Sequence, residues 1–158
     1  MSAGRYHTSA IRSGGTLFTW GLGTSGQLGD GTAISKSSPV QIGSDSWSFI
    51  GAGGTHTSAI RSDGYLFTWG LGTSGQLGDG TTVSKSSPVQ IGSSSWTAIQ
   101  AGDLHSLAIR SGGTLFAWGV NTNGQLGDGT TTNKNSPVQI GSSSWIAVSS
   151  GQQHTLGM

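Results

Sequence analysis

Apolar and polar residues alternate in short runs along the chain, and glycine interrupts nearly every run. The segment Trp96-Thr-Ala-Ile-Gln-Ala101, for example, alternates over six positions and stops at Gly102. Period-two runs bounded by turn residues predict β-strands. Glycine or a β-branched residue breaks every window in which a helical period of 3.6 residues would have to develop. The pattern therefore predicts an all-β chain without helices.

The whole pattern recurs every 49 residues. Residues 4–52 and 53–101 are identical at 39 of 49 positions, and residues 102–150 form a third copy. A stub, residues 151–158, begins the same motif again. Periods of 40–50 residues are typical of repeat architectures such as propellers. We therefore expect a single domain over residues 1–158, made of these three repeats and the stub.

Each repeat is expected to contain four short strands. In the second copy, His56–Ile60 and Tyr65–Trp69 flank a Ser-Asp-Gly turn, and Asp-Gly favours a hairpin because glycine adopts positive φ cheaply. Pro88–Ile91 follows a long polar loop, and its leading proline suits an outer or starting strand. Four strands in such a repeat are typical of a β-propeller blade. The predicted fold class is therefore all-β, with blades of four antiparallel strands.

Three blades are too few for a closed ring, since propellers usually have four to eight. The chain begins and ends within the same motif, so we expect the first blade to lack its innermost strand. A spare strand, Trp145–Val148, is expected at the other end. Either a second copy completes the ring head to tail, or the chain is a slice of a longer array. Both alternatives remain open at this point, and an unpaired strand edge would otherwise favour aggregation.

Composition narrows the functional classes. Lysine and arginine number 7, aspartate numbers 6 with no glutamate, and the net charge is +1. Phosphate binding and polybasic membrane anchoring both need clustered basic residues, so we expect no nucleic-acid and no membrane partner. The absence of cysteine excludes disulfides, thiolate metal sites and cysteine nucleophiles.

Histidines at the repeat interval are the first candidates for chemistry. A ring of imidazoles at one rim of a channel could bind a metal or an anion. A structural role explains identical positions in every repeat without a ligand, so we expect each histidine to brace its own blade corner by donating to a backbone carbonyl. The histidines are His7, His56, His105 and His154.

Two further recurrent residue types are expected to be structural. One carboxylate per Leu-Gly-Asp-Gly motif is too few for calcium, and a turn aspartate that accepts hydrogen bonds from its own backbone explains the motif. A tryptophan ends one strand of each repeat and is expected to pack between blades, with stacking on a sugar as the alternative. These residues are Asp30, Asp79, Asp128, Trp20, Trp69 and Trp118.

No catalytic arrangement is present in the sequence. There is no Gly-x-Ser-x-Gly elbow, and the glycine-rich stretch Gly21–Gly26 lacks the lysine and the following helix of a phosphate loop. Paired carboxylates for glycoside cleavage are also missing. We expect a protein that is not an enzyme and that uses no metal and no cofactor.

Two groups of positions that differ among the repeats lie in loops, one directly before each histidine and one in the polar loop after Leu-Gly-Asp-Gly. Variable loops on a constant scaffold usually carry binding specificity. We predict that a ligand or partner contacts these residues, which are Arg5, Tyr6, Gly54, Thr55, Asp103, Leu104, Gln152, Gln153, Ile34, Val83 and Asn133.

Three linked motifs resemble the regulator of chromosome condensation repeat. They are Gly-x-x-His-[Ser/Thr]-x-Ala-Ile at Gly53–Ile60, Leu-Phe-x-Trp-Gly at Leu66–Gly70 and Gly-Gln-Leu-Gly-Asp-Gly at Gly75–Gly80, and all three recur in the third copy. The resemblance covers essentially the whole chain. Ser9 and Ser58 depart from it, standing where the family usually has an apolar residue.

The resemblance implies a propeller that has seven blades in other members. Some members act as nucleotide-exchange factors for small GTPases and bind nucleosomes, others are protein-interaction modules, and similar repeats occur in bacterial and phage-encoded surface proteins. The exchange activity belongs to loops with no counterpart in this sequence, so no functional residue is carried over.

We therefore expect a non-enzymatic β-propeller module, structural or protein-binding, whose partner is another protein or a second copy of itself. Low charge and a surface rich in glycine, serine and threonine favour an extracellular or virion-surface component, such as part of a phage tail or capsid appendage. The alternatives are a carbohydrate- or receptor-binding, lectin-like head and an exchange factor for a small GTPase.

Overall fold

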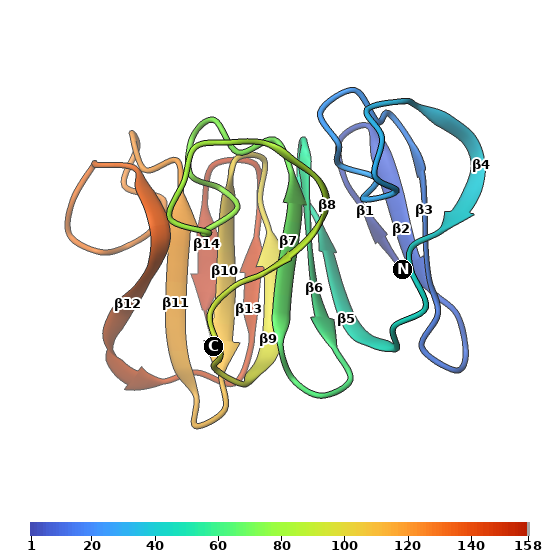
Figure 1. Cartoon of the computed structure of the whole chain (residues 1–158). Helices are drawn as coiled ribbons and strands as arrows, with labels where there is room; N and C mark the ends of the chain where they lie inside the picture. The colour runs from blue at the N-terminus through green and yellow to red at the C-terminus, as the bar shows by residue number, and fades with distance from the viewer. Residues whose placement is uncertain (158) are drawn as a thin grey trace.

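Four antiparallel β-sheets stand side by side as blades (Figure 1). The computed structural model describes residues 1–157. The first blade consists of β1 (Ser2–Ala3), β2 (His7–Ile11), β3 (Leu17–Gly21) and β4 (Lys36–Gln41). The second consists of β5 (Trp47–Ala52), β6 (His56–Arg61), β7 (Leu66–Gly70) and β8 (Lys85–Gln90). The third consists of β9 (Trp96–Ala101), β10 (His105–Arg110), β11 (Thr114–Gly119) and β12 (Lys134–Ser144), and the fourth of β13 (Val148–Ser150) and β14 (Thr155–Gly157). The all-β prediction and the four-stranded blade are confirmed.

Strand order within each blade follows the chain from the centre of the array outwards. The first strands contact one another across blades, β1 with β5, β5 with β9 and β9 with β13, so they lie nearest the common axis. In the second blade His56 pairs with Gly70, which places the start of β6 beside the end of β7. The turn before each histidine and the long loop after β3, β7 or β11 therefore lie at the same end of the blade.

Three strand predictions differ from the structure in detail. The first blade does have an inner strand, the two-residue β1, which pairs Ser2 with Ser9. The spare strand is Val148–Ser150 and does not include Trp145, because β14 offers only three described residues for pairing. Pro88 is the fourth residue of β8 and not its first. The outer position predicted for this strand is correct, and an outer strand needs no ladder hydrogen bond from proline on its open side.

Apolar residues of adjacent blades form the core between the sheets. Ile60 and Leu66 of the second blade pack against Trp96, Phe116 and Trp118 of the third. The Trp96 ring meets those of Phe116 and Trp118 edge to face, at centroid distances of 5.5 and 6.2 Å. The second and third sheets thus bury both faces against their neighbours, which is how a chain with few apolar residues obtains a core.

Glycine is required where one loop meets the tryptophan of the next blade. Gly78 has a φ of +73°, and a Cβ atom there would lie 2.6 Å from Nε1 of Trp118. Gly127 occupies the same motif with the same φ of +73°, but its nearest neighbour would be Cγ2 of Ile140 at 3.7 Å. The two glycines therefore share a backbone conformation and differ in what lies behind them.

We expect Gly78→Ala to lower the free energy of unfolding by about 3 kcal/mol, because it adds a clash to the cost of a left-handed alanine. Gly127→Ala should cost only the conformational part, about 1 kcal/mol. Urea denaturation of both variants measures the difference. Equal losses would show that the Trp118 contact is unimportant.

Candidate functional site

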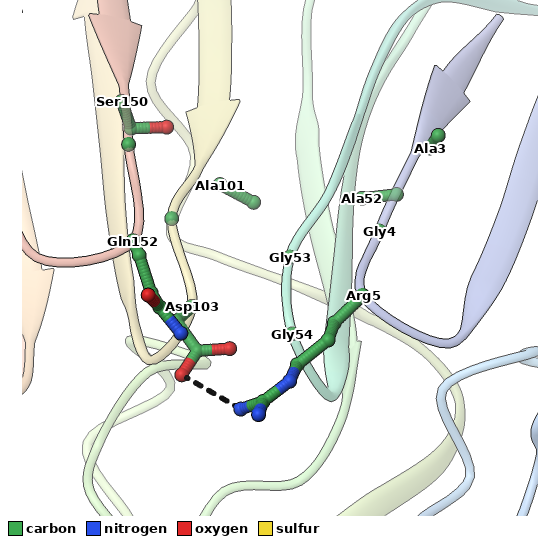
Figure 2. A pocket seen from close by; sticks show the side chains of 12 residues that line it. Ala3, Gly4, Arg5, Ala52, Gly53, Gly54, Ala101, Asp103, Ser150 and Gln152 are labelled. Carbon is green, nitrogen blue, oxygen red and sulfur yellow. Dashed lines mark ion pairs between the residues drawn. The ribbon is translucent and has the colours of Figure 1, made fainter.

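Equivalent residues of four blades surround an open depression of about 320 Å³ on the axis of the array (Figure 2). It is lined by Ala3, Gly4, Arg5, Ala52, Gly53, Gly54, Ala101, Gly102, Asp103, Ser150, Gly151 and Gln152. Each blade supplies three consecutive residues, and the third of them occupies the first variable position before a histidine. We call Arg5, Gly54, Asp103 and Gln152 the axial rim. The structure thus gathers four of the eleven predicted contact residues in one place.

The rim carries one ion pair, between Arg5 and Asp103. Arg5 Nη1 lies 3.7 Å from Asp103 Oδ2, and the side chains are 52% and 21% exposed. Figure 2 shows the guanidinium reaching past Gly54 toward the carboxylate. A Cβ atom at Gly54 would collide with Oδ1 of Asp103, so the absence of a side chain here leaves room for the acid from the next blade.

Backbone hydrogen bonds between blades hold the rim in place. The Arg5 N–H donates to the carbonyl of Gly53 at 3.2 Å, and the Gly54 N–H donates to that of Asp103 at 3.0 Å. Main-chain atoms make these bonds, so they do not depend on the variable side chains. A constant frame therefore presents a different side chain from each blade.

Residues at the second variable position lie beside the rim without lining the depression. The carbonyls of Tyr6, Thr55 and Leu104 each accept a hydrogen bond of 2.9 Å from the residue that starts the long loop of the same blade. The Tyr6 side chain is 53% exposed. Gln153 is exposed and its Oε1 lies 3.4 Å from Nδ2 of Asn123 in the third long loop.

The second variable group lies on the long loops at the same end of the blades. Ile34 and Val83 are exposed, and Oδ1 of Asn133 accepts a hydrogen bond of 2.8 Å from the Asn121 N–H. These three residues do not line the axial depression. Both variable groups nevertheless share one face of the array, since the register brings their loops to the same end of each blade.

The histidines lie between blades instead of around the depression. His7 Nε2 is 2.7 Å from Thr57 Oγ1, and His56 Nε2 is 2.9 Å from Ser106 Oγ. The Thr57 hydroxyl donates its hydrogen to the carbonyl of Gln27 at 2.8 Å, so it must accept from the imidazole. Nε2 of both histidines therefore carries a proton, since the Ser106 hydroxyl likewise donates to the carbonyl of Gln76. The expected acceptor, a carbonyl of the same blade, is wrong, because packing brings a hydroxyl of the next blade closer.

Burial determines the protonation of these imidazoles. It lowers the pKa of His7 to about 4 and that of His56 to about 3, and it also lowers the pKa of His105. Nδ1 of each of these rings has no hydrogen-bond partner within residues 1–157. His154 is exposed. No group of three or more His, Cys, Asp or Glu side chains in this described part of the chain could hold a metal ion.

Tryptophan completes the contact between blades. The indole N–H groups of Trp69 and Trp118 donate to the carbonyls of Gln27 and Gln76, both at 3.0 Å. The same carbonyls accept the hydroxyls of Thr57 and Ser106. We call this unit the interblade clamp: a histidine and a glutamine carbonyl of one blade bound to a hydroxyl and an indole of the next. Trp69 and Trp118 are fully buried and so unavailable for stacking on a sugar.

The Leu-Gly-Asp-Gly aspartates organise their own loops. Asp128 Oδ1 accepts hydrogen bonds from the Thr130 backbone N–H at 2.9 Å and hydroxyl at 2.8 Å, and Oδ2 lies 3.3 Å from Lys134 Nζ. The Thr130 hydroxyl bond is the main cause that lowers the pKa of Asp128 to about 2. Asp30 and Asp79 make the same contacts in their loops. All three carboxylates are thus already engaged by neighbouring protein groups.

Four-stranded antiparallel sheets that pack face to face around a common axis, with their first strands innermost, define a β-propeller module. The chain belongs to the regulator of chromosome condensation (RCC1) repeat family, whose model matches residues 14–60, 63–109 and 112–158. A second model of the same repeat matches residues 47–76 and 96–125. The predicted family is therefore confirmed.

Solved structures support the fold. The chain is similar to Prp20p from Saccharomyces cerevisiae, with 22% identity, a TM-score of 0.86 and coverage of 98% of this chain and 42% of that one. Yeast RCC1 (Prp20) bound to Kap60 gives 21% identity, a TM-score of 0.87 and coverage of 98% and 40%. This chain thus spans less than half the length of both yeast chains, and at such identities the likeness concerns the fold alone.

A curated relative matches over one repeat length. The probable E3 ubiquitin-protein ligase HERC4 of Rattus norvegicus, like that of Mus musculus, is 38% identical over 52 residues, which is 32% of this chain and 5% of the ligase. The match is therefore to a small part of a much longer protein.

Within the described residues, no helix is long and apolar enough to cross a membrane.

Proposed function

We propose that this chain is a non-catalytic protein-interaction module that contacts its partner through the axial rim and the adjacent Tyr6. The observation that supports this proposal is the convergence of variable positions. The repeats differ directly before each histidine, and the first of those positions from all four blades lines one depression. Variable side chains that gather at one place on a constant frame are typical of a binding surface.

The chemistry of the rim favours a partner with a carboxylate or carbonyl group for Arg5. Arg5 and Tyr6 are both about half exposed, and arginine and tyrosine are enriched among residues that dominate binding energy. The Arg5–Asp103 pair is solvent-accessible at 3.7 Å, and such pairs contribute at most about 1 kcal/mol. A partner acceptor can therefore replace Asp103 at little cost.

Relatives support a protein as the partner. The structure of Prp20p was described together with its binding to Gsp1p and histones, and yeast RCC1 was solved in complex with Kap60. Low charge and the glycine-, serine- and threonine-rich composition favour a module within a larger surface or virion assembly.

Purified Gsp1p, core histones and Kap60 are suitable first probes, measured against the immobilised chain by biolayer interferometry. We expect Arg5→Ala to weaken binding of the recognised protein at least tenfold, which corresponds to the loss of one charge-assisted hydrogen bond. Arg12→Ala is the matched control, because Arg12 is exposed and follows β2, at the opposite end of the blade from the rim.

Three outcomes would overturn the proposal. The first is that none of the proteins binds, or that both arginine variants weaken binding equally. The second is a glycan-array signal that Arg5→Ala abolishes, which would indicate a carbohydrate-binding head. The third is faster nucleotide release from Gsp1p in the presence of the chain, which would indicate an exchange factor.

A further inference from the structure

The interblade clamp is complete inside the array and half-made at both of its ends. Trp69 and Trp118 are fully buried and donate to glutamine carbonyls, whereas Trp20 is partly exposed and makes no such bond within residues 1–157. Gln27 and Gln76 each accept two donors, a hydroxyl and an indole. Among the described residues, the equivalent carbonyl of Gln125 accepts one such donor, the hydroxyl of Thr155, at 2.8 Å.

The outward face of the first blade carries the residues that the inner blades bury. Ala10, Phe18 and Trp20 are all partly exposed. In the second blade Ala59, the counterpart of Ala10, and Trp69, the counterpart of Trp20, are fully buried. Thr8, at the position of Thr57 and Ser106, makes no side-chain hydrogen bond within the described chain. This face therefore has the composition of a blade interface without a blade against it.

The fourth blade is held by a short pairing. Within residues 1–157 it consists of β13 and β14, which pair over three residues. Leu156 of β14 is 65% exposed, and beside it lies a depression of about 200 Å³ lined by Ala147, Val148, Ser149, Leu156 and Gly157. A short strand that leaves apolar surface exposed can be exchanged for the equivalent strand of a second copy.

We propose that two copies of this chain associate head to tail, with β13 of one copy pairing with β2 of the other in a shared blade. β14 of the first copy and β1 of the second are displaced. The two interfaces between four-stranded blades within the chain serve as the template for the one at each junction. The second copy is then one protein partner of the proposed interaction module, and in that respect alone the inference rests on the proposed function.

Each junction replaces two short pairings with one. The pairings given up are β1–β2, with two residue pairs, and β13–β14, with three. β2 has five residues where β14 has three, and it begins with His7-Thr8 where the chain has His154-Thr155 before and at the start of β14, so β2 can adopt the same register on β13. The pairing given up is short, and the new contacts between blades compensate for it.

The gained contacts complete the clamp. Thr8 of one copy takes the place of Thr155 of the other, donating to the Gln125 carbonyl and accepting from His105. Trp20 then supplies the missing indole donor to the same carbonyl and becomes buried with Phe18. Two such junctions close a ring of six blades, within the range of four to eight found in propellers.

Native mass spectrometry of the 158-residue chain tests the proposal, and we expect a species of twice 16.0 kDa. Thr8→Val should weaken dimerisation at least tenfold, because it removes hydrogen bonds that exist only between copies. Thr155→Val is the isosteric control and should leave the dimer as stable or make it more stable, since Thr155 is bonded only before the exchange. Trp20→Ala should prevent dimerisation at the same concentration.

A monomer at all concentrations, or an open series of higher oligomers, would overturn the inference. So would a dimer that Thr155→Val weakens and Thr8→Val does not, because β14 would then remain in its own blade. Arg5→Ala separates this inference from the proposed function. It removes the arginine of the rim and should leave the dimer intact, so loss of partner binding with an unchanged dimer concerns the rim alone.

Discussion

Trp118→Ala is expected to lower the free energy of unfolding by about 3–5 kcal/mol. The Trp118 side chain is fully buried, packs edge to face on Trp96 and donates to the carbonyl of Gln76. Truncation leaves a cavity between two blades and an acceptor with one donor fewer. For a domain whose total stability is about 5–15 kcal/mol, such a loss is a large fraction.

Trp20→Ala is the matched control for this prediction. Trp20 ends the same Leu-Phe-x-Trp motif but is only partly buried, so its removal should cost about 1 kcal/mol in dilute protein, where the chain is monomeric. Urea denaturation monitored by circular dichroism measures both variants. A loss at Trp20 as large as at Trp118 would mean that exposure at the end of the array has no energetic consequence.

Acidification is expected to destabilise the fold over a pH range that is set by the pKa values of the buried histidines in the unfolded and the folded chain. Burial lowers the pKa of His7 from 6.5 to about 4 and that of His56 to about 3. Between pH 6.5 and these values the unfolded chain binds protons that the folded chain does not, so the free energy of unfolding falls as the pH falls. Above pH 6.5 neither the folded nor the unfolded chain protonates these histidines, so stability is undiminished there. At pH 4 the free energy of unfolding is lowered by about 3 kcal/mol through His7.

The structural reason for this sensitivity is the geometry of the clamp. A second proton would go to Nδ1, which has no acceptor within residues 1–157. It would also place a charge between blades, where His7 and His105 disfavour the protonation of His56. The aspartates act in a different window, because the pKa of Asp128 is lowered to about 2 and its contribution is lost only below about pH 4.

Urea denaturation at intervals between pH 7.5 and 4 tests this expectation. His56→Gln retains a side-chain donor for Ser106 and should flatten the pH dependence. A profile that is flat in the parent chain, or as steep in His56→Gln as in the parent chain, would contradict the burial of neutral imidazoles.

The candidate site was only partly predictable from the sequence. Comparison of the repeats identified Arg5 and Asp103 as variable, because their neighbours are nearly constant. It did not show that they form a pair at 3.7 Å, since they belong to the first and third blades and meet only at the axis. The repeat pattern did not predict that Gly54 leaves room for Asp103 either, because the two residues belong to different repeats.

The sequence by itself determined the repeat, the strands and the blade. These features depend on interactions within about 49 residues: alternation that matches a pleated strand, Ser-Asp-Gly and similar turns, and glycines where positive φ is needed. Each repeat carries the same local instructions, so each repeat forms the same four strands wherever all of them are present.

Only the tertiary structure decided what each repeated residue does. Trp20 and Trp118 stand in the same motif, yet one is partly exposed and the other fully buried. His56 braces a neighbouring blade, while His154 lies in solvent. Burial and hydrogen bonding depend on which blade lies alongside, and that neighbour is supplied by a segment a full repeat away. Identical sequences therefore acquire different energies and protonation states from their positions in the array.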